Sequence, residues 1–152
     1  MLISVPCANI KETQALAARV ARVAKKGDAF LLFGTLGVGK SVFARAFIET
    51  LCKAGEVPSP TFTLVQTYTA LGFEIYHFDL YRLKDSEEIW ELNMEEALFG
   101  AVSLIEWPEK MGAYMPKNAI KVSISNVSEN ARLIEIECDD DEKQKRLKQI
   151  RV

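Results

Sequence analysis

The chain has 152 residues, of which 49% are hydrophobic and 26% charged, with a formal net charge of −2 at pH 7. This length predicts one domain, residues 1–152, with a sizeable core. The slightly acidic balance argues against a protein that grips nucleic acid over a broad basic face. Three widely spaced cysteines predict neither a disulfide framework nor a zinc site. With no signal-peptide pattern and no apolar run of the ~20 residues that a membrane span needs, we expect a cytoplasmic protein.

The first 27 residues predict an edge strand followed by a helix. Residues 2–6 are mostly apolar, and Pro6 is tolerated only at the end or the edge of a sheet. Asn9 and Glu12 have the spacing of a capping box, which marks the start of a helix. The helix is expected to end at Gly27, and one of its faces carries apolar residues at helical spacing, Leu16, Val20 and Val23.

The next segment fits the pattern G-x-x-x-x-G-K-[ST], which forms loops that bind nucleotide phosphates. It consists of Gly34, Thr35, Leu36, Gly37, Val38, Gly39, Lys40 and Ser41. The glycines let successive backbone N–H groups point at one anion, and Lys40 adds a point charge for the outer phosphates. The Ser41 hydroxyl can bind a magnesium ion.

The residues around this loop favour a phosphate site over the alternative of a flexible glycine turn. Residues 29–33 are a short apolar run, as expected of a buried parallel strand. After the loop, apolar residues recur at helical spacing until Gly55, namely Phe43, Phe47 and Leu51. In a strand–loop–helix unit the helix N-terminus supplies the anion site. The sequence therefore predicts binding of a nucleoside triphosphate.

The remaining chain mixes strands and helices. Two prolines stiffen residues 57–61, and residues 62–69 and 73–80 are predicted to form a hairpin. Asp85 and Glu88 can cap a helix that runs to about residue 99. Residues 101–105 predict a second buried strand, and residues 119–127 and 132–138 predict a late strand pair. The tail is acidic and then basic, which suits a terminal helix that is either solvated or a docking surface for a partner.

These elements predict an α/β fold of the P-loop NTPase type. We expect a central mixed, partly parallel sheet flanked by helices, with an antiparallel hairpin and with antiparallel strands at one side.

Acidic residues follow two of the predicted strands. Asp79 ends the strand 76–78, and Glu106 follows the apolar run 102–105. The carboxyl ends of parallel strands share the sheet edge that carries the phosphate loop, so both acids can hold magnesium and orient the water that attacks the γ-phosphate. Thr61 can offer a second hydroxyl to the metal. The alternatives are that Asp79 caps the following turn and that Glu106 is a surface acid.

Other side chains near these acids have more than one interpretation. We expect a surface or packed role for His77, which faces away from Phe78 on an alternating strand. Trp107 either packs in the core or forms a lid beside the nucleotide. Arg82 is a candidate for an arginine finger.

Four blocks in this order resemble the TsaE family, the bacterial ATPases of tRNA threonylcarbamoyladenosine biosynthesis. They are the loop 34–41, S-P-T-F-T-L at 59–64, Y-H-F-D-L-Y-R-L at 76–83 and I-E-W-P-E at 105–109. The resemblance implies an ATPase that uses ATP and Mg²⁺ and acts with two partner proteins, TsaB and TsaD, through which it meets tRNA. It does not imply that this chain installs the modification.

The same resemblance implies roles for particular residues. Lys40, Asp79 and Glu106 would be catalytic, and Mg²⁺ would be bound by Ser41, Thr61, Asp79 and Glu106. Thr13 and Arg132 would lie near the nucleotide, and Trp107 would join them there if it forms a lid. The loop differs from the usual family pattern, with Thr35 in place of an acid and Val42 in place of a second hydroxyl, and Asn93 stands where a glycine is usual.

Three other functions share the phosphate loop. A small-molecule or nucleoside kinase needs a lid and an acceptor pocket, and a GTPase needs a guanine-reading N-K-x-D stretch, which Pro116-Lys117-Asn118 does not complete. A non-catalytic scaffold would use bound nucleotide only to shape a partner surface. We expect a slow ATPase, monomeric when alone.

Overall fold

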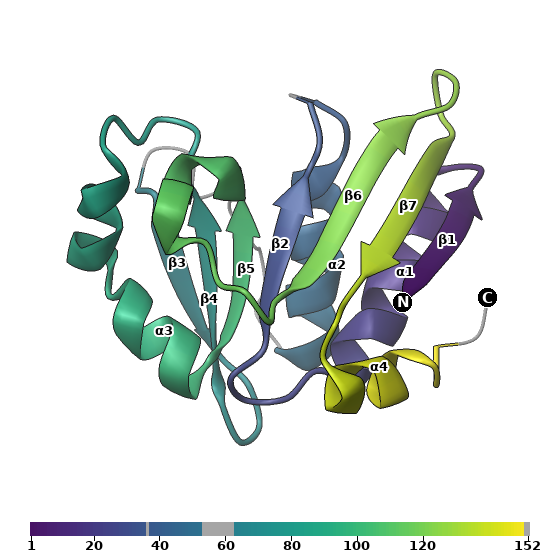
Figure 1. Ribbon diagram of the computed structural model, residues 1–152. Coiled ribbons are helices and arrows are strands. Elements are labelled where there is room, and N and C mark those ends of the chain that lie inside the picture. Colours follow the sequence, from purple (N-terminus) through teal and green to yellow (C-terminus); the bar gives the residue numbers. More distant parts are fainter. Residues whose placement is uncertain (36, 53–62, 151–152) are drawn as a thin grey trace.

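The computed structural model describes residues 1–35, 37–52 and 63–150, and a single seven-stranded sheet runs through them (Figure 1). The strand order is β1-β7-β6-β2-β5-β4-β3. The strands are β1 (Leu2–Cys7), β2 (Ala29–Phe33), β3 (Val65–Thr69), β4 (Glu74–Asp79), β5 (Val102–Glu106), β6 (Ile120–Asn126) and β7 (Arg132–Glu137).

The centre of the sheet is parallel and both of its sides are antiparallel. β2 pairs with β5 and β6 in parallel, and β4 joins β5 in parallel. The predicted hairpin β3–β4 adds an antiparallel strand at one side, and β6, β7 and β1 form an antiparallel set at the other. The mixed, partly parallel sheet is confirmed, and its antiparallel strands lie at both sides rather than at one, because the chain also turns back along β7 after β6.

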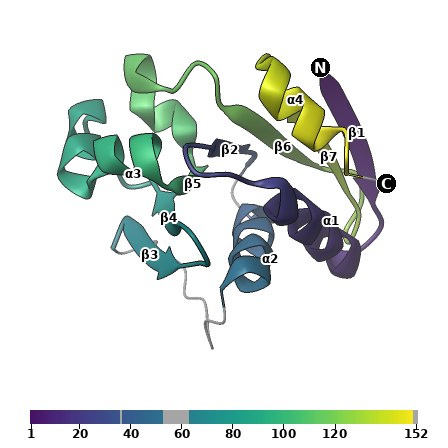
Figure 2. The same ribbon diagram turned by 90° about the horizontal axis from the view of Figure 1, so that it is seen from below.

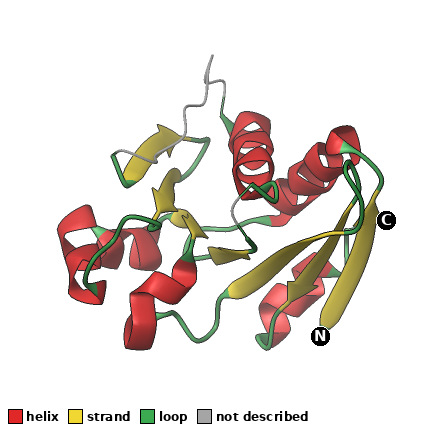
Figure 3. Ribbon diagram, turned by 90° about the horizontal axis from the view of Figure 1, so that it is seen from above, coloured by secondary structure: helices red, strands yellow, loops and turns green. Residues whose placement is uncertain are grey.

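Helices cover both faces of this sheet, as Figures 2 and 3 show from its two ends. α1 (Ile10–Val23) and α2 (Lys40–Leu51) pack on one face. The other face carries α3 (Met94–Gly100) and two 3₁₀ helices, η1 (Ser86–Leu92) and η2 (Pro108–Tyr114). Each face buries its own apolar cluster, so the central strands are buried on both sides, as parallel strands require.

The helix expected between Asp85 and residue 99 is two helices. Its start is as predicted, since the Asp85 side chain accepts from the backbone N–H of Glu87 at 3.1 Å and Glu88 completes a capping box. Asn93 then adopts a left-handed conformation, with φ of 62°, which ends η1 before α3 begins. Asparagine tolerates this conformation better than most residues do, so the break falls at this position.

Within the described parts of the chain, no helix is long and apolar enough to cross a membrane. Cys7, Cys52 and Cys138 are buried free thiols. Burial raises the pKa of Cys7 and of Cys52, so both stay protonated.

A buried arginine anchors the terminal helix α4 (Asp141–Leu147) to the segment that joins α1 to β2. The Arg146 guanidinium donates to both carboxylate oxygens of Asp28, at 2.7 and 2.9 Å, and to the carbonyl oxygen of Val23 at 2.6 Å. These contacts raise the pKa of Arg146 further above its ordinary value, chiefly through the hydrogen bonds to Asp28. The sequence predicts that this helix is either solvated or a docking surface for a partner. Neither of these two roles includes a buried ion pair.

We expect Arg146→Met to lower the free energy of unfolding by ~3 kcal/mol, because it leaves the buried Asp28 carboxylate without its cation. Urea denaturation measures this difference. Lys25→Ala is the control, since its ion pair with Glu142 is exposed on both sides and should contribute almost nothing. Equal effects of the two substitutions would contradict an anchoring role for Arg146.

Candidate functional site

The phosphate loop joins the carboxyl end of β2 to the N-terminus of α2. Gly37 and Gly39 have φ values of 78° and 116°, and Gly39 caps the helix in a left-handed conformation. Glycine adopts these values without a steric penalty. Thr35 is exposed and its carbonyl oxygen accepts from the backbone N–H of Val38 at 3.2 Å. Leu36 lies outside the described residues.

Arg132, at the start of β7, holds the loop in place from the same end of the sheet. Its Nε donates to the carbonyl oxygen of Val38 at 2.8 Å, and Nη1 donates to three carbonyl oxygens of the turn between β6 and β7. Val38 is buried. The loop therefore has a fixed position relative to β7, although the two segments are far apart in the sequence.

Lys40 is almost fully buried at the start of α2. Its Nζ donates to the carbonyl oxygen of Gly34 at 2.6 Å and lies 3.4 Å from the centre of the Trp107 ring. Burial lowers the pKa of Lys40, and the nearby carboxylates Glu106, Glu109 and Asp79 oppose that shift. The ammonium group therefore lies between the loop backbone and a cluster of acids.

Asp79 and Glu106 face this lysine from the ends of adjacent parallel strands. They are paired in register on β4 and β5, and both are buried. The Ser41 hydroxyl donates to the Glu106 carboxylate, with oxygen–oxygen distances of 3.1 and 3.3 Å. Asp79 also accepts from the backbone N–H of Tyr81 at 3.1 Å, so it caps the following turn as well as facing the site. Glu106 is not a surface acid.

Trp107 closes the outer side of this cluster. It has φ of 59° and ψ of 49°, a left-handed conformation that is uncommon for a bulky residue. Its ring packs against that of Tyr81, with 4.9 Å between centroids, and covers the Lys40 ammonium. Trp107 is partly buried and also packs against the apolar cluster on the α3 side of the sheet, so it lies at the border between the core and this cluster. Arg82 is exposed on the turn beyond Asp79.

A cavity of about 260 Å³ separates the loop from these side chains. It is lined by Gly37, Gly39, Lys40, Ser41, Val42, Asp79, Tyr81, Glu106 and Trp107. In the described residues, no group of three or more His, Cys, Asp or Glu side chains could hold a metal ion by itself. Two carboxylates and one hydroxyl nevertheless fit Mg²⁺, which takes few protein ligands when phosphate oxygens and water complete its shell. Thr61, the fourth predicted ligand, lies outside the described residues.

A second cavity, of about 180 Å³, lies on the other side of the loop. Thr13 and Arg132 both line it, as do the apolar side chains Ile10, Val38 and Val42. Of the predicted site residues that the structure describes, all but Gly34 and Thr35 line one of these two cavities.

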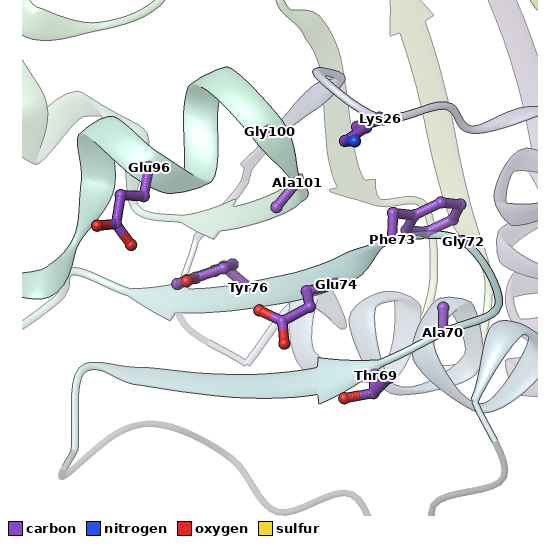
Figure 4. Close-up of a pocket in the computed structure, with 10 residues that line it drawn as sticks. All are labelled: Lys26, Thr69, Ala70, Gly72, Phe73, Glu74, Tyr76, Glu96, Gly100 and Ala101. Atoms are coloured by element: carbon purple, nitrogen blue, oxygen red, sulfur yellow. The ribbon is translucent and has the colours of Figure 1, made fainter.

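A third cavity, of about 530 Å³ and so larger than either of these two, lies at the opposite edge of the sheet (Figure 4). Glu74 and Tyr76 from β4 and Glu96 from α3 surround it, with Lys26 at one end. Two carboxylates flanking a tyrosine repel a polyphosphate, so cavity size alone does not locate the nucleotide site.

Comparison with known proteins gives a consistent result. The family model of the threonylcarbamoyl adenosine biosynthesis protein TsaE matches residues 7–134. The chain belongs to the TsaE family. The TsaE protein of Rickettsia felis is 46% identical over 84% of this chain and 75% of its own length, and that of Bacillus subtilis is 35% identical over 83% and 79%. The crystal structure of Bacillus subtilis YdiB has the same fold, with a TM-score of 0.80, 25% identity and coverage of 98% of this chain and 93% of that one.

Sequence reasoning missed two features of this TsaE site. His77 was expected to be a packed or surface residue, and it is packed, but its imidazole contacts Glu106. Its position two residues before Asp79, on the same face of β4, was the available signal. The Tyr81–Trp107 contact joins two predicted segments and has no local signal.

We expect Gly34→Ala to destabilise the loop more than a glycine substitution elsewhere. A Cβ at Gly34 would lie 2.6 Å from Val38 Cγ1 and 2.8 Å from the carbonyl oxygen of Ile124, at a φ of 150°. Gly72→Ala is the matched control, because φ is also positive there but nothing lies within 4 Å. The free energy of unfolding from urea denaturation should fall at least ~1 kcal/mol further for Gly34→Ala. Identical losses would mean that the loop can relax around a side chain.

Proposed function

We propose that this TsaE-family chain binds ATP with Mg²⁺ at the phosphate loop and hydrolyses it in tRNA threonylcarbamoyladenosine biosynthesis. The observation that carries the proposal is the position of Lys40 and Ser41 against the paired carboxylates Asp79 and Glu106. A phosphate-binding loop alone can bind, whereas hydrolysis also needs groups that hold a metal and aim a water. The names of the relatives place them in the same biosynthesis.

Each side chain has a distinct task in the proposed reaction. The backbone N–H groups of the loop and the Lys40 ammonium bind the phosphates, and the loop glycines allow the close approach. Ser41, Asp79, Glu106 and Thr61 would hold Mg²⁺, which neutralises charge on the β- and γ-phosphates when bound. Glu106 or Asp79 orients the attacking water by accepting a hydrogen bond from it.

The base of the nucleotide would enter the second cavity. Thr13 and Arg132 line that cavity together with apolar side chains, which suits a flat aromatic ring with polar edges. Trp107 would act as a lid over the phosphates and limit the access of bulk water.

The kinase alternative is less favoured by the same geometry. A kinase closes arginines over the phosphates and needs an acceptor pocket beside them. Among the described residues that line the cavity next to Asp79 and Glu106, none is an arginine. This chain would therefore use ATP to change its own conformation or its grip on a partner.

We expect one substitution to weaken ATP binding and another to slow ATP hydrolysis without preventing binding. Lys40→Ala removes the cation that contacts phosphate, which contributes ~1.5–3 kcal/mol, so ATP affinity should fall at least about tenfold. Glu106→Gln keeps the size of the side chain and should bind ATP but turn it over far more slowly.

Calorimetric titration and a phosphate-release assay measure these two effects. Lys26→Ala is the charge-matched control, because that lysine lines the cavity at the opposite edge of the sheet. Normal ATP affinity in Lys40→Ala would show that the loop is not the site. Wild-type turnover in Glu106→Gln would remove that residue from the mechanism.

The partners in this proposal are TsaB and TsaD, and tRNA reaches the chain only through their complex. We expect a monomeric, slow ATPase in the cytoplasm when the chain is alone. ATP should strengthen docking on the TsaB–TsaD pair, and hydrolysis should reset the complex between rounds of modification.

A pull-down with ATP, with ADP and without nucleotide tests this docking. The retained fraction should be highest with ATP, and in a modification assay Glu106→Gln should support few rounds per enzyme. The proposal fails if the retained fraction is the same with ATP, with ADP and without nucleotide, and if Glu106→Gln supports many rounds of modification per enzyme.

A further inference from the structure

Beneath the two acids of the site lies a buried histidine that the mechanism above does not use. His77 has no exposed surface and lies on β4 beside Leu104 of β5. It shares the face of β4 that carries Asp79, because the two residues are two positions apart on the strand. Its Nε2 is 2.6 Å from Glu106 Oε2.

The chemistry of the two groups decides which of them donates in this hydrogen bond. A carboxylate can only accept, so the His77 Nε2–H is the donor and Glu106 the acceptor. His77 Nδ1 is also buried and has no hydrogen-bond partner within the described residues. The contact therefore joins a ring N–H of His77 to a carboxylate oxygen of Glu106, and it is the one hydrogen bond that the described residues offer to this ring.

Glu106 is thus held from two directions. The histidine bonds Oε2 from inside the sheet, and Ser41 Oγ lies 3.1 Å from Oε1 and 3.3 Å from Oε2 at the start of α2. A glutamate has three rotatable side-chain bonds, so a single contact with Ser41 would leave its carboxylate free to turn. The contact with His77 restricts this rotation of the Glu106 carboxylate.

We propose that His77 is a positioning residue that fixes the Glu106 carboxylate against Ser41 and the phosphate loop. The inference rests on the proposed function, because it assigns to His77 the geometry of the acid on which hydrolysis depends. Catalytic groups need support from neighbours that are themselves locked in place, and a shift of about 1 Å can lower a rate by ~10²-fold. His77 acts through Glu106 and needs no contact with ATP.

Three substitutions separate positioning from simple packing. The amide of Gln reaches about as far as the imidazole Nε2, so His77→Gln retains a donor to Glu106. His77→Asn carries the same amide on a side chain that is one methylene shorter and cannot reach. His77→Leu fills the space with no donor. Ile75→Val, on the same strand and face, shows what a mild core defect alone does.

We would measure kcat and KM for ATP hydrolysis at a temperature at which circular dichroism shows that each variant is folded. A crystal structure of each variant would show the position of the Glu106 carboxylate. We expect kcat at least about tenfold lower for His77→Asn and His77→Leu, with KM within about twofold of wild type. His77→Gln should recover kcat to within about threefold of wild type, and Ile75→Val should keep it. Only wild type, His77→Gln and Ile75→Val should hold the Glu106 carboxylate against Ser41.

The inference is overturned if all three His77 variants lose activity equally, or if none does and Glu106 has not moved. Should His77→Asn fail to fold, the comparison of His77→Leu with His77→Gln decides. A wild-type chain that hydrolyses no ATP, alone or with its partners, would defeat the proposed function instead. The position of the Glu106 carboxylate in the variant crystals would then decide the role of His77 by itself.

Discussion

Three ionisable side chains are buried together where the phosphate loop meets the ends of β4 and β5. Lys40, Asp79 and Glu106 are 4%, 6% and 3% exposed. Burying charges is costly unless each is paired and hydrogen-bonded, which requires the sheet, the loop and α2 to meet in one geometry. The parallel pairing of β4 with β5 supplies two carboxylates in register, and α2 brings the ammonium and the Ser41 hydroxyl to them. The other strands and helices hold the sheet, the loop and α2 in this arrangement.

Features encoded by local pattern were predictable from the sequence. The apolar run before the loop became β2, and the capping residues Asn9 and Asp85 begin helices where expected. Acids at the carboxyl ends of parallel strands meet at one edge of the sheet, so the sequence predicts that Asp79 and Glu106 lie together, as their pairing on β4 and β5 shows. The sequence does not distinguish packing from a lid for Trp107, because it gives the neighbours of this residue along the chain but not the direction of its ring.

Contacts between distant segments were not predictable in the same way. The bonds from His77 to Glu106, from Arg132 to Val38 and from Arg146 to Asp28 join residues 29, 94 and 118 positions apart. Periodicity says which face a side chain occupies, but not which strand or helix lies opposite it. The antiparallel set at the β1 side depends on the same long-range choice, since a strand's pattern does not reveal the direction of its neighbour.

In the proposed function, the cluster at the end of the sheet would hold a nucleoside triphosphate together with a divalent cation. Calorimetric titration of the unmodified chain with ATP, with and without Mg²⁺, tests it most directly. We expect one ATP per chain, bound more tightly when Mg²⁺ is present, because Ser41 and the two carboxylates would then hold the metal, whose charge offsets that of the phosphates. Absence of binding, or an affinity that does not change with Mg²⁺, would contradict it.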